Sequence, residues 1–220
     1  GKQTGDRAGY SVSLSADGKT VAVGSPNHNS GNNDFGQVRI FKNNSGTWKQ
    51  IGSDLNGKNG IASSYGHSVS LSSDGSRIAI GAPYNSSTAI HGGLVEIYEN
   101  KSGTWIKIFS DKGILENGQH VGQRLGYAVS LSDDGKLLIA GLPRAIGAYT
   151  KGQANIYSIP ETTPPKITGP SGGASSSSSS KSINENSTTV HTFSANETVT
   201  WSLNGGADAS KFNINSSTGA

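Results

Sequence analysis

The chain has 220 residues, of which 32% are hydrophobic and 15% charged, with 31 glycines and a formal net charge of +3. Its abundant glycine, serine, threonine and asparagine disfavour helix interiors, so the composition predicts short strands joined by polar turns. Cysteine is absent, which excludes disulfides and thiolate chemistry, and the scattered basic residues give no reason to expect a nucleic-acid partner. No apolar run approaches the roughly 18 residues that would cross a bilayer, so we expect no membrane span in this segment.

One stretch of sequence occurs three times. "GYSVSLSADGKTVAVGSP" begins at Gly9. A near-copy begins 57 residues later, at Gly66, and a second one begins 60 residues after that, at Gly126. Val12 and Leu14 alternate with serines, which is the period of a half-buried strand. The Asp-Gly that follows predicts a tight hairpin, and the short apolar run after it predicts a second, more deeply buried strand.

Two further motifs keep the same spacing. A third strand is predicted in each repeat by "GQVRIF" from Gly36, "GLVEIY" from Gly93 and "GQANIY" from Gly152. A fourth is predicted in only two of them, by "SGTWKQI" from Ser45 and "SGTWIKI" from Ser102. The unit is therefore a four-stranded antiparallel sheet of about 57 to 60 residues, and its third copy lacks the outer strand.

Stacking is the way in which such a small sheet can bury both of its faces. Sheets of four strands arranged radially are the blades of a β-propeller, whereas solenoid repeats are shorter, at about 20 to 45 residues. We therefore predict an all-β chain with a partial β-propeller of three blades over residues 1–160. The start of a β-sandwich is predicted beyond it.

The repeated pattern Gly-Tyr/His-Ser/Ala-Val-Ser-Leu-Ser-x-Asp-Gly, followed by an apolar strand that ends in Gly-x-Pro, resembles the FG-GAP repeats of integrin-α-like propellers. The resemblance covers about residues 4–159. Seven blades usually close the ring in that family, and three are visible here, so the total number of blades is left open. Methionine is absent, even at position 1, so we expect an internal part of a longer chain, with earlier blades upstream and residues 126–159 as the last blade.

The composition changes after residue 160. Residues 161–182, with "PPKITGP" and a run of serines, are predicted to be a stiff and then flexible linker. Residues 183–220 carry an "INENS" opening and "WSLNGGADASKFNINSSTG", which resemble the first half of a bacterial cadherin-like domain. A complete sandwich of this kind needs about 100 residues, so these residues predict only its beginning.

Calcium is the cofactor to consider. The turn aspartates Asp17, Asp74 and Asp134 stand where some integrin-type blades carry a calcium loop, but each turn offers too few carboxylates for six to eight oxygen ligands, so a hairpin turn is favoured. The resemblance to cadherin-like domains implies a calcium role for Glu185, at the junction with the preceding module. Glu185 is the predicted metal ligand, and a solvated glutamate at a strand start is the alternative.

Catalytic motifs are not found. No nucleophile elbow, His-Glu-x-x-His or phosphate-binding Gly-Lys-Ser/Thr occurs, and the five histidines are dispersed. His67 stands where the other repeats have tyrosine, which favours a structural role. The repeated Trp48 and Trp105 are interpreted as packing between blades rather than as a carbohydrate-binding ladder. The sequence thus predicts that the chain is not an enzyme.

The resemblance implies part of a large secreted or cell-surface, adhesin-like protein. Its propeller would bind a protein or glycan ligand, through loops that the sequence does not identify, and cadherin-like modules would serve as calcium-stiffened spacers. The alternative is a non-catalytic propeller attached to an extracellular hydrolase, and an intracellular interaction propeller is a third possibility. Since one scaffold hosts many activities, the choice depends on the site.

Overall fold

The computed structural model describes residues 1–29, 35–57, 63–87, 91–113, 122–144 and 152–160, and the backbone of two short paired strands, β13 (Ile167–Thr168) and β14 (Ser194–Ala195). Every regular element in these ranges is a β-strand, which confirms the all-β prediction. The chain divides into two compact units, Gly1–Pro160 and Glu161–Ala220. Apart from β13 and β14, the predicted linker and cadherin-like segment lie outside the described residues.

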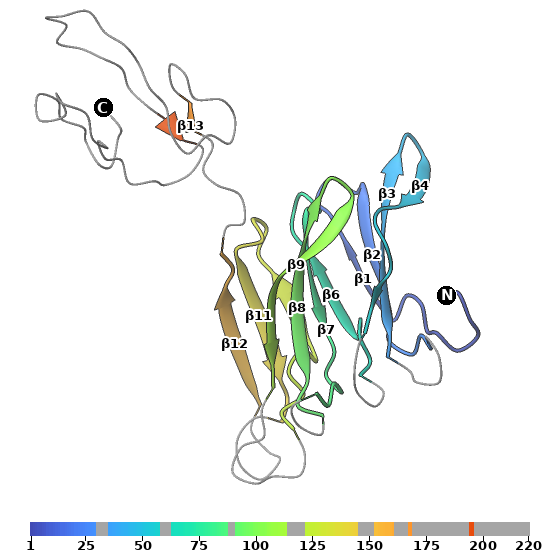
Figure 1. Cartoon of the computed structure of the whole chain (residues 1–220), viewed down its shortest axis with the longest axis vertical. Helices are drawn as coiled ribbons and strands as arrows, with labels where there is room; N and C mark the ends of the chain where they lie inside the picture. Colours follow the sequence, from blue (N-terminus) through green and yellow to red (C-terminus); the bar gives the residue numbers. More distant parts are fainter. Residues whose placement is uncertain are drawn as a thin grey trace, which may run out of the picture. The chain divides into compact units, whose positions relative to one another are not determined.

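Unit 1 contains three antiparallel sheets that follow one another along the chain (Figure 1). Within each sheet, strands that are consecutive in sequence pair with each other, except that β5 pairs with β3. Sheet 1 comprises β1 (Ser11–Leu14), β2 (Thr20–Ser25), β3 (Gln37–Asn44), β4 (Thr47–Gln50) and a short β5 (Leu55–Asn56) beside β3; sheet 2 comprises β6 (Ser68–Leu71), β7 (Arg77–Gly81), β8 (Leu94–Lys101) and β9 (Thr104–Lys112); sheet 3 comprises β10 (Val129–Leu131), β11 (Leu137–Leu142) and β12 (Gln153–Ser158).

The first two strands of every sheet form a hairpin, as the repeated Asp-Gly predicts. In sheet 1 the turn aspartate Asp17 accepts hydrogen bonds from the Ser15 hydroxyl (2.7 Å) and the Lys19 amide (2.9 Å). Gly18, which follows Asp17, has a φ of 67°, a conformation that glycine adopts without strain. The same contacts and conformation recur in sheets 2 and 3.

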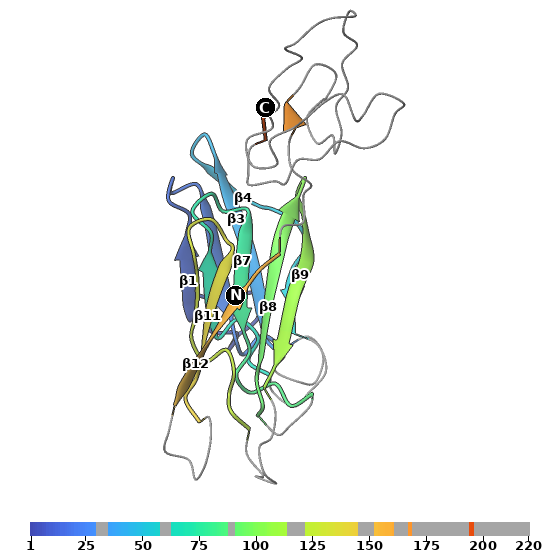
Figure 2. The same cartoon turned by 90° about the vertical axis from the view of Figure 1, so that its left-hand side faces the viewer.

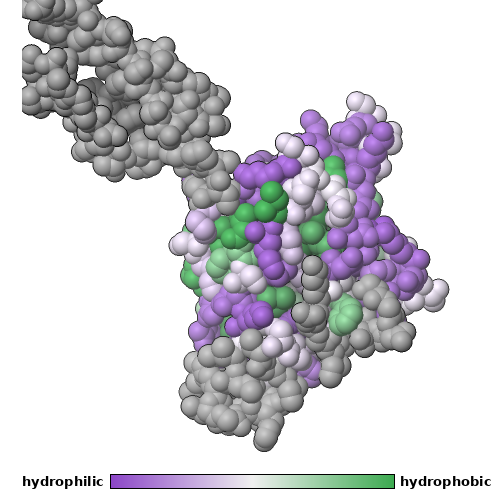
Figure 3. Space-filling model, in the orientation of Figure 1, coloured by the Kyte–Doolittle hydropathy of each residue, from purple (hydrophilic) through white to green (hydrophobic). Residues whose placement is uncertain are grey.

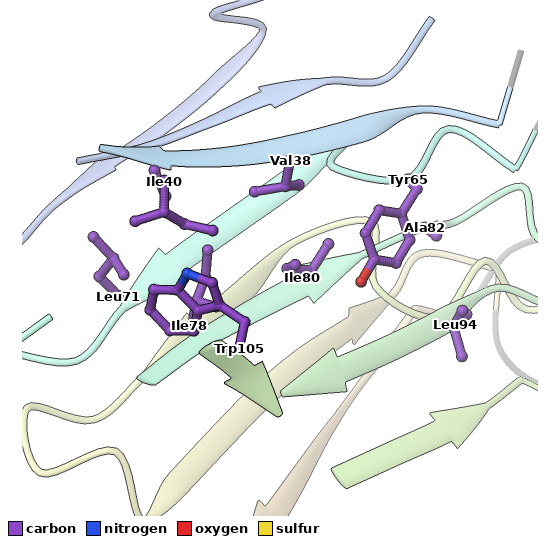
Figure 4. Close-up of a cluster of buried hydrophobic side chains, with 10 residues drawn as sticks. Val38, Ile40, Tyr65, Leu71, Ile78, Ile80, Ala82, Leu94 and Trp105 are labelled. Carbon is purple, nitrogen blue, oxygen red and sulfur yellow. The ribbon is translucent and has the colours of Figure 1, made fainter. Parts of the chain in front are cut away.

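The sheets stack face to face, and the first core lies between sheets 1 and 2. We call the face that a sheet turns toward the next sheet its leading face, and the opposite one its trailing face. Apolar side chains of both faces meet in this core, as Figure 4 shows, with contributions from Val38, Ile40, Leu71, Ile78, Ile80 and Trp105. Alternation in each strand therefore places every second residue in an interface between sheets.

The second core, between sheets 2 and 3, repeats the arrangement. The leading face of sheet 2 contributes Ala79, Val95 and Ile97, which lie against Leu131 and Leu138 of sheet 3. Because a sheet that is buried on both faces needs a neighbour on each side, sheet 2 occupies the middle of the stack. Successive small antiparallel sheets packed in this way confirm the predicted partial propeller, and among the described residues the third sheet has three strands.

Hydrogen bonds link the first strands of adjacent sheets. The Ser11 hydroxyl donates to the carbonyl of Gly66 (2.7 Å), and the amide of Leu71 donates to the Ser13 hydroxyl (3.0 Å). The same pair of contacts joins sheets 2 and 3. In sheets 1 and 2, the serines that alternate with apolar residues in the repeat therefore make inter-sheet contacts.

The surface carries a mixture of polar and apolar residues. Figure 3 shows hydrophobic residues at the surface over β8 and β9, where Ile106 is 48% exposed. In the part of the chain that the structure describes, no helix is long and apolar enough to cross a membrane.

Candidate functional site

A row of aromatic rings lies where the first strand of each sheet begins. Tyr10 and His67 immediately precede β1 and β6, and Tyr127 lies two residues before β10. In all three sheets the preceding turn has the same shape, with a hydrogen bond from the ring residue's amide to the carbonyl three positions earlier, at 3.0–3.2 Å. The glycine before each ring has a positive φ, between 83° and 88°. The repeat thus sets equivalent side chains beside one another.

The three rings stand in contact. The ring centroids of Tyr10 and His67 are 5.1 Å apart, and those of His67 and Tyr127 are 4.7 Å apart. Tyr10 is 51% exposed and Tyr127 42% exposed, and His67 is half-buried between them. We call these three residues the aromatic row. Solvent-accessible rings of this kind present apolar surface together with polar tips.

Hydrogen bonds determine which nitrogen of His67 carries the proton. Nδ1 lies 3.1 Å from the carbonyl oxygen of Tyr127, which can only accept, so Nδ1 is protonated. Nε2, 3.3 Å from the Tyr10 hydroxyl, is then the acceptor in the neutral ring. Burial lowers the pKa of His67 below its usual 6.5, against the opposing effect of the Tyr127 carbonyl. His67 is therefore neutral at pH 7, with the lone pair of Nε2 directed at the Tyr10 hydroxyl.

This protonation state predicts an acid-sensitive fold. Because the pKa of His67 is lower in the folded than in the unfolded chain, the neutral ring stabilises the fold above pH 6.5 and this stability is lost as the pH falls below it. The variant His67→Tyr, which restores the residue of the other repeats, should show a smaller decrease in Tm between pH 7 and pH 5 than the wild type. An equal decrease in both proteins, measured by circular dichroism, would contradict this assignment.

A second group of side chains adjoins the aromatic row. Tyr84, which follows β7, lies 6.2 Å from the ring of His67 and 5.5 Å from that of His91. The guanidinium of Arg124 lies over the Tyr84 ring at 4.8 Å, a cation–π arrangement. Burial, followed by the charges of Arg124 and Arg144, lowers the pKa of His91. Within the described part of the chain, the buried Nε of Arg124 has no hydrogen-bond partner.

The combined site can therefore do two things chemically. Its exposed tyrosine rings can stack against the apolar face of a ligand, and its hydroxyl, imidazole and guanidinium groups can form hydrogen bonds with polar substituents. A few polar groups set among aromatic rings are typical of small-molecule sites. Arg124 adds a positive charge, which favours a ligand with anionic or strongly polar groups.

The turn aspartates do not form a cation site. Each of Asp17, Asp74 and Asp134 accepts hydrogen bonds from a neighbouring serine and a backbone amide. These contacts lower the pKa of each carboxyl, and at Asp74 they outweigh burial, which opposes ionisation. A calcium ion needs six to eight oxygen ligands, and one carboxylate engaged in a turn does not supply them. Among the described residues no group of three potential metal ligands occurs. Glu185 lies outside those residues.

Two other polar clusters are explained by folding. Glu96 accepts hydrogen bonds from the hydroxyls of Tyr65 and Tyr98, both 2.8 Å, and pairs with Lys107 at 2.9 Å. Burial, and then the charge of Glu96, raises the pKa of Tyr65. This network ties Tyr65, in the segment between sheets 1 and 2, to β8 and β9 of sheet 2 with its polar atoms satisfied, which is the condition for placing a carboxylate in a core.

The second cluster is the buried pair Asp6–His28 (3.0 Å) near the start of the chain. Burial opposes ionisation of Asp6, but hydrogen bonds from the backbone of Gln3, from His28 and from the backbone of Lys2 outweigh it and lower the pKa of the carboxyl.

A cleft of about 260 Å³, lined by residues that include Lys42 and Asp74, lies by the hairpin turn of sheet 2. That turn is at the opposite end of β6 from the aromatic row.

The two repeated tryptophans differ. Trp105 is 8% exposed and its indole donates to the carbonyl of Ile51 (3.0 Å), so the packing interpretation is confirmed for this residue. Trp48, at the equivalent position of sheet 1, is 45% exposed, so the same interpretation is not confirmed there. The reason is that Trp105 packs on the preceding sheet, and within the described residues no sheet precedes sheet 1.

Comparisons with known proteins find structural likeness alone. No protein-family model matches the chain, and no curated protein matches it. Similar solved structures include a protein provisionally described as a 6-phosphogluconolactonase from Bacteroides uniformis (14% identity, TM-score 0.38, covering 67% of this chain and 40% of that one), the periplasmic gluconolactonase of Pseudomonas aeruginosa (18%, 0.41, 72% and 47%) and a thermostable family-43 glycoside hydrolase (13%, 0.36, 79% and 60%). The chain spans 40 to 60% of the length of these structures.

One sequence-based expectation is corrected by these comparisons. The lack of catalytic motifs predicted that the chain is not an enzyme, but all three similar structures are described as enzymes. The nucleophile elbow, His-Glu-x-x-His and Gly-Lys-Ser/Thr motifs belong to other folds, so their absence from the sequence does not exclude catalysis here.

Proposed function

We propose that this chain is part of an extracellular or cell-surface protein whose FG-GAP-like sheets bind a glycan ligand at the aromatic row. The observation that carries the proposal is the exposure of Tyr10 and Tyr127 on either side of His67, with ring separations of 5.1 and 4.7 Å. Rings that served only to pack sheets together would be covered by their neighbours, as Trp105 is.

A glycan suits this chemistry better than an apolar ligand does. Sugar rings have an apolar face, which can stack on tyrosine, and a rim of hydroxyls, which need donors and acceptors. The hydroxyl of Tyr10, Nε2 of His67 and the guanidinium of Arg124 supply both kinds of group close to the rings. The proposal extends to residues 183–220 as a cadherin-like spacer that binds calcium through Glu185.

Substitution of Tyr127 should weaken glycan binding. Removing one stacking ring should weaken the free energy of binding by about 1.4 kcal/mol, near the upper limit for one aromatic contact. This change corresponds to about a tenfold increase in Kd. The measurement is a glycan-array screen with the full chain, followed by calorimetric titration of the best ligand against wild type and Tyr127→Ala.

Trp48→Ala provides the matched control. Trp48 exposes a similar fraction of its side chain, 45% against 42% for Tyr127, but it lies in β4 rather than in the row. This variant should bind as the wild type does. If Trp48→Ala loses affinity and Tyr127→Ala does not, the ligand binds near Trp48 in β4 and the aromatic row is not the binding site.

A second candidate function is the propeller of an extracellular hydrolase. The observation that favours it is the neutral His67, whose Nε2 accepts from the Tyr10 hydroxyl at 3.3 Å in a partly accessible position, so that a substrate group replacing this contact would meet a general base. Glycans and sugar lactones incubated with the chain and with His67→Tyr distinguish the two functions. Turnover that is lost in the variant would indicate catalysis, and binding without turnover would indicate recognition.

A further inference from the structure

One charged group beside the aromatic row has no counterpart in the protein. The half-buried guanidinium of Arg124 lies over the ring of Tyr84 at 4.8 Å. Within the described residues, its buried Nε has no hydrogen-bond partner and no carboxylate forms an ion pair with it. A guanidinium that is partly withdrawn from water and left without a counter-charge attracts an anion. The place for that anion is next to the stacking rings.

Arg77 shows how the same protein satisfies a guanidinium that serves the fold. Arg77 is 5% exposed, and its Nη2 lies 3.2 Å from Oε1 of Glu99. Its Nη1 donates to the carbonyl of Gly135 in sheet 3, at 3.1 Å. A carboxylate and a carbonyl thus compensate this cation between sheets 2 and 3. Arg124 makes neither kind of contact in the described part of the chain, so folding does not explain its charge.

Backbone contacts fix the position of Arg124 relative to the row. Its amide donates to the carbonyl of His91 (3.1 Å), and its own carbonyl accepts from the amide of Tyr127 (3.2 Å). Arg124 therefore belongs to the turn that leads into sheet 3 and is tied to the loop of sheet 2. Sheet 3 faces the viewer in Figure 2, with β7 and β8 of sheet 2 behind it. Because the arrangement lies between two sheets of the stack, it does not depend on what adjoins either end.

Two further arginines add positive charge around the row. Burial, followed by the charges of Arg124 and Arg144, lowers the pKa of His91, so both guanidinium groups act at the same place. Arg7 occupies the position of Arg124 in the first repeat. Its carbonyl accepts from the amide of Tyr10 (3.1 Å), and its φ of 52° matches the 59° of Arg124. An arginine thus stands in the turn at each end of the row, which favours a ligand with more than one acid group.

We propose that the glycan bound at the aromatic row is acidic, with a carboxylate or sulfate group held by the guanidinium of Arg124 while a sugar ring stacks on Tyr127. This inference rests on the proposed glycan-binding function and adds the charge class of the ligand. The planar guanidinium offers two parallel N–H donors, which match two oxygens of a carboxylate or sulfate. Stacking on Tyr84 holds those donors in place before the ligand arrives, which lowers the entropic cost of binding.

The test compares ligands that differ only in charge. Oligogalacturonides and their methyl esters form one pair, and sulfated and desulfated galactan oligosaccharides form the other. Each is titrated calorimetrically into the full chain. The acid form of at least one pair should bind about tenfold or more tightly than its neutral form, because its hydrogen bonds to Arg124 are charge-assisted. High salt should reduce this preference. The pair that shows it identifies the acid group as carboxylate or sulfate.

Variants test whether Arg124 carries the preference. Arg124→Gln should bind the acid and neutral forms with similar affinity. Arg124→Lys should keep part of the preference, because it retains the charge but not the planar pair of donors. Arg39→Gln is the matched control, since the guanidinium of Arg39 also lies over an aromatic ring, that of Phe41 at 5.4 Å. It belongs to β3, on the trailing face of sheet 1, and its variant should show the wild-type preference.

Three results would overturn the proposal, and they can be told apart. Equal binding of acid and neutral forms to the wild type, or binding of neutral glycans alone, would remove the acid group and leave glycan recognition in place. Absence of binding to both pairs and to the glycan array would overturn the proposed function as well. A preference that persists in Arg124→Gln would assign the anion to another cation. The wild-type comparison needs no substitution, so it decides the charge class even where a variant fails to fold.

Discussion

Replacing Ile97 by alanine is expected to lower the free energy of unfolding by about 2–5 kcal/mol, the range for truncating a buried isoleucine. The side chain is 0% exposed and lies in the core between sheets 2 and 3, which has little freedom to collapse onto a cavity. Urea denaturation monitored by tryptophan fluorescence provides the measurement, and the change should appear in the midpoint with an unchanged slope.

The repeat itself offers the control, because Ile156 occupies the equivalent place in sheet 3 and is 71% exposed. Ile156→Ala should change the free energy of unfolding by no more than about 0.5 kcal/mol. Equal losses in the two variants would mean that the leading face of sheet 3 is covered within a single chain.

The second large effect is expected at Gly81. A Cβ there would lie 2.0 Å from the carbonyl oxygen of Gly126 and 2.3 Å from the Ser68 hydroxyl, and a backbone carbonyl cannot rotate aside as a side-chain end can. Gly81→Ala should therefore lower the free energy of unfolding by about 3 kcal/mol, the upper part of the usual range for overpacking. Thermal and urea denaturation of the variant measure the loss.

Gly141→Ala is the matched comparison. It makes the same chemical change at the same place in the repeat, but the new methyl group would lie 3.8 Å from its nearest neighbour. No measurable loss is expected. If Gly81→Ala proves as mild as Gly141→Ala, the first strand of sheet 3 can shift and the interface is not close-packed.

Much of the fold could be predicted from the sequence because its cause is local and repeated. The alternation around Val12 and Leu14 predicts the first strand, and the Asp-Gly predicts the hairpin. Both are present in every sheet. The spacing then implies stacking, since a four-stranded sheet has two faces to cover. None of these steps requires knowledge of a distant contact.

The exposure of particular residues could not be predicted in the same way. Trp48 and Trp105 have near-identical flanking sequences, yet one is exposed and the other buried. What separates them is whether another sheet lies behind, which is a property of the stack rather than of the repeat. Glu96 is a similar case, because alternation alone does not reveal that two tyrosines and a lysine satisfy its carboxylate in the interior.

The aromatic row was missed for a different reason. His67 replaces a tyrosine of the other repeats, and the substitution was interpreted as evidence for a purely structural position. The repeat does contain the signal, since equivalent positions of stacked sheets are neighbours in space. Tyr10, His67 and Tyr127 therefore had to lie side by side. Such a row can be predicted from the repeat when equivalent positions of successive repeats are placed side by side in the stack, in addition to the alternation of residues along each strand.

The near-regular spacing of those rings has a consequence for how a chain-like ligand dissociates. A linear polymer that stacks on one ring finds a similar ring about 5 Å away, so it can shift by one place and remain bound instead of escaping. Such sliding favours long ligands over short ones through the number of alignments alone. The imidazole in the middle position breaks this degeneracy, because a ligand group that hydrogen-bonds to Nε2 marks one alignment as preferred.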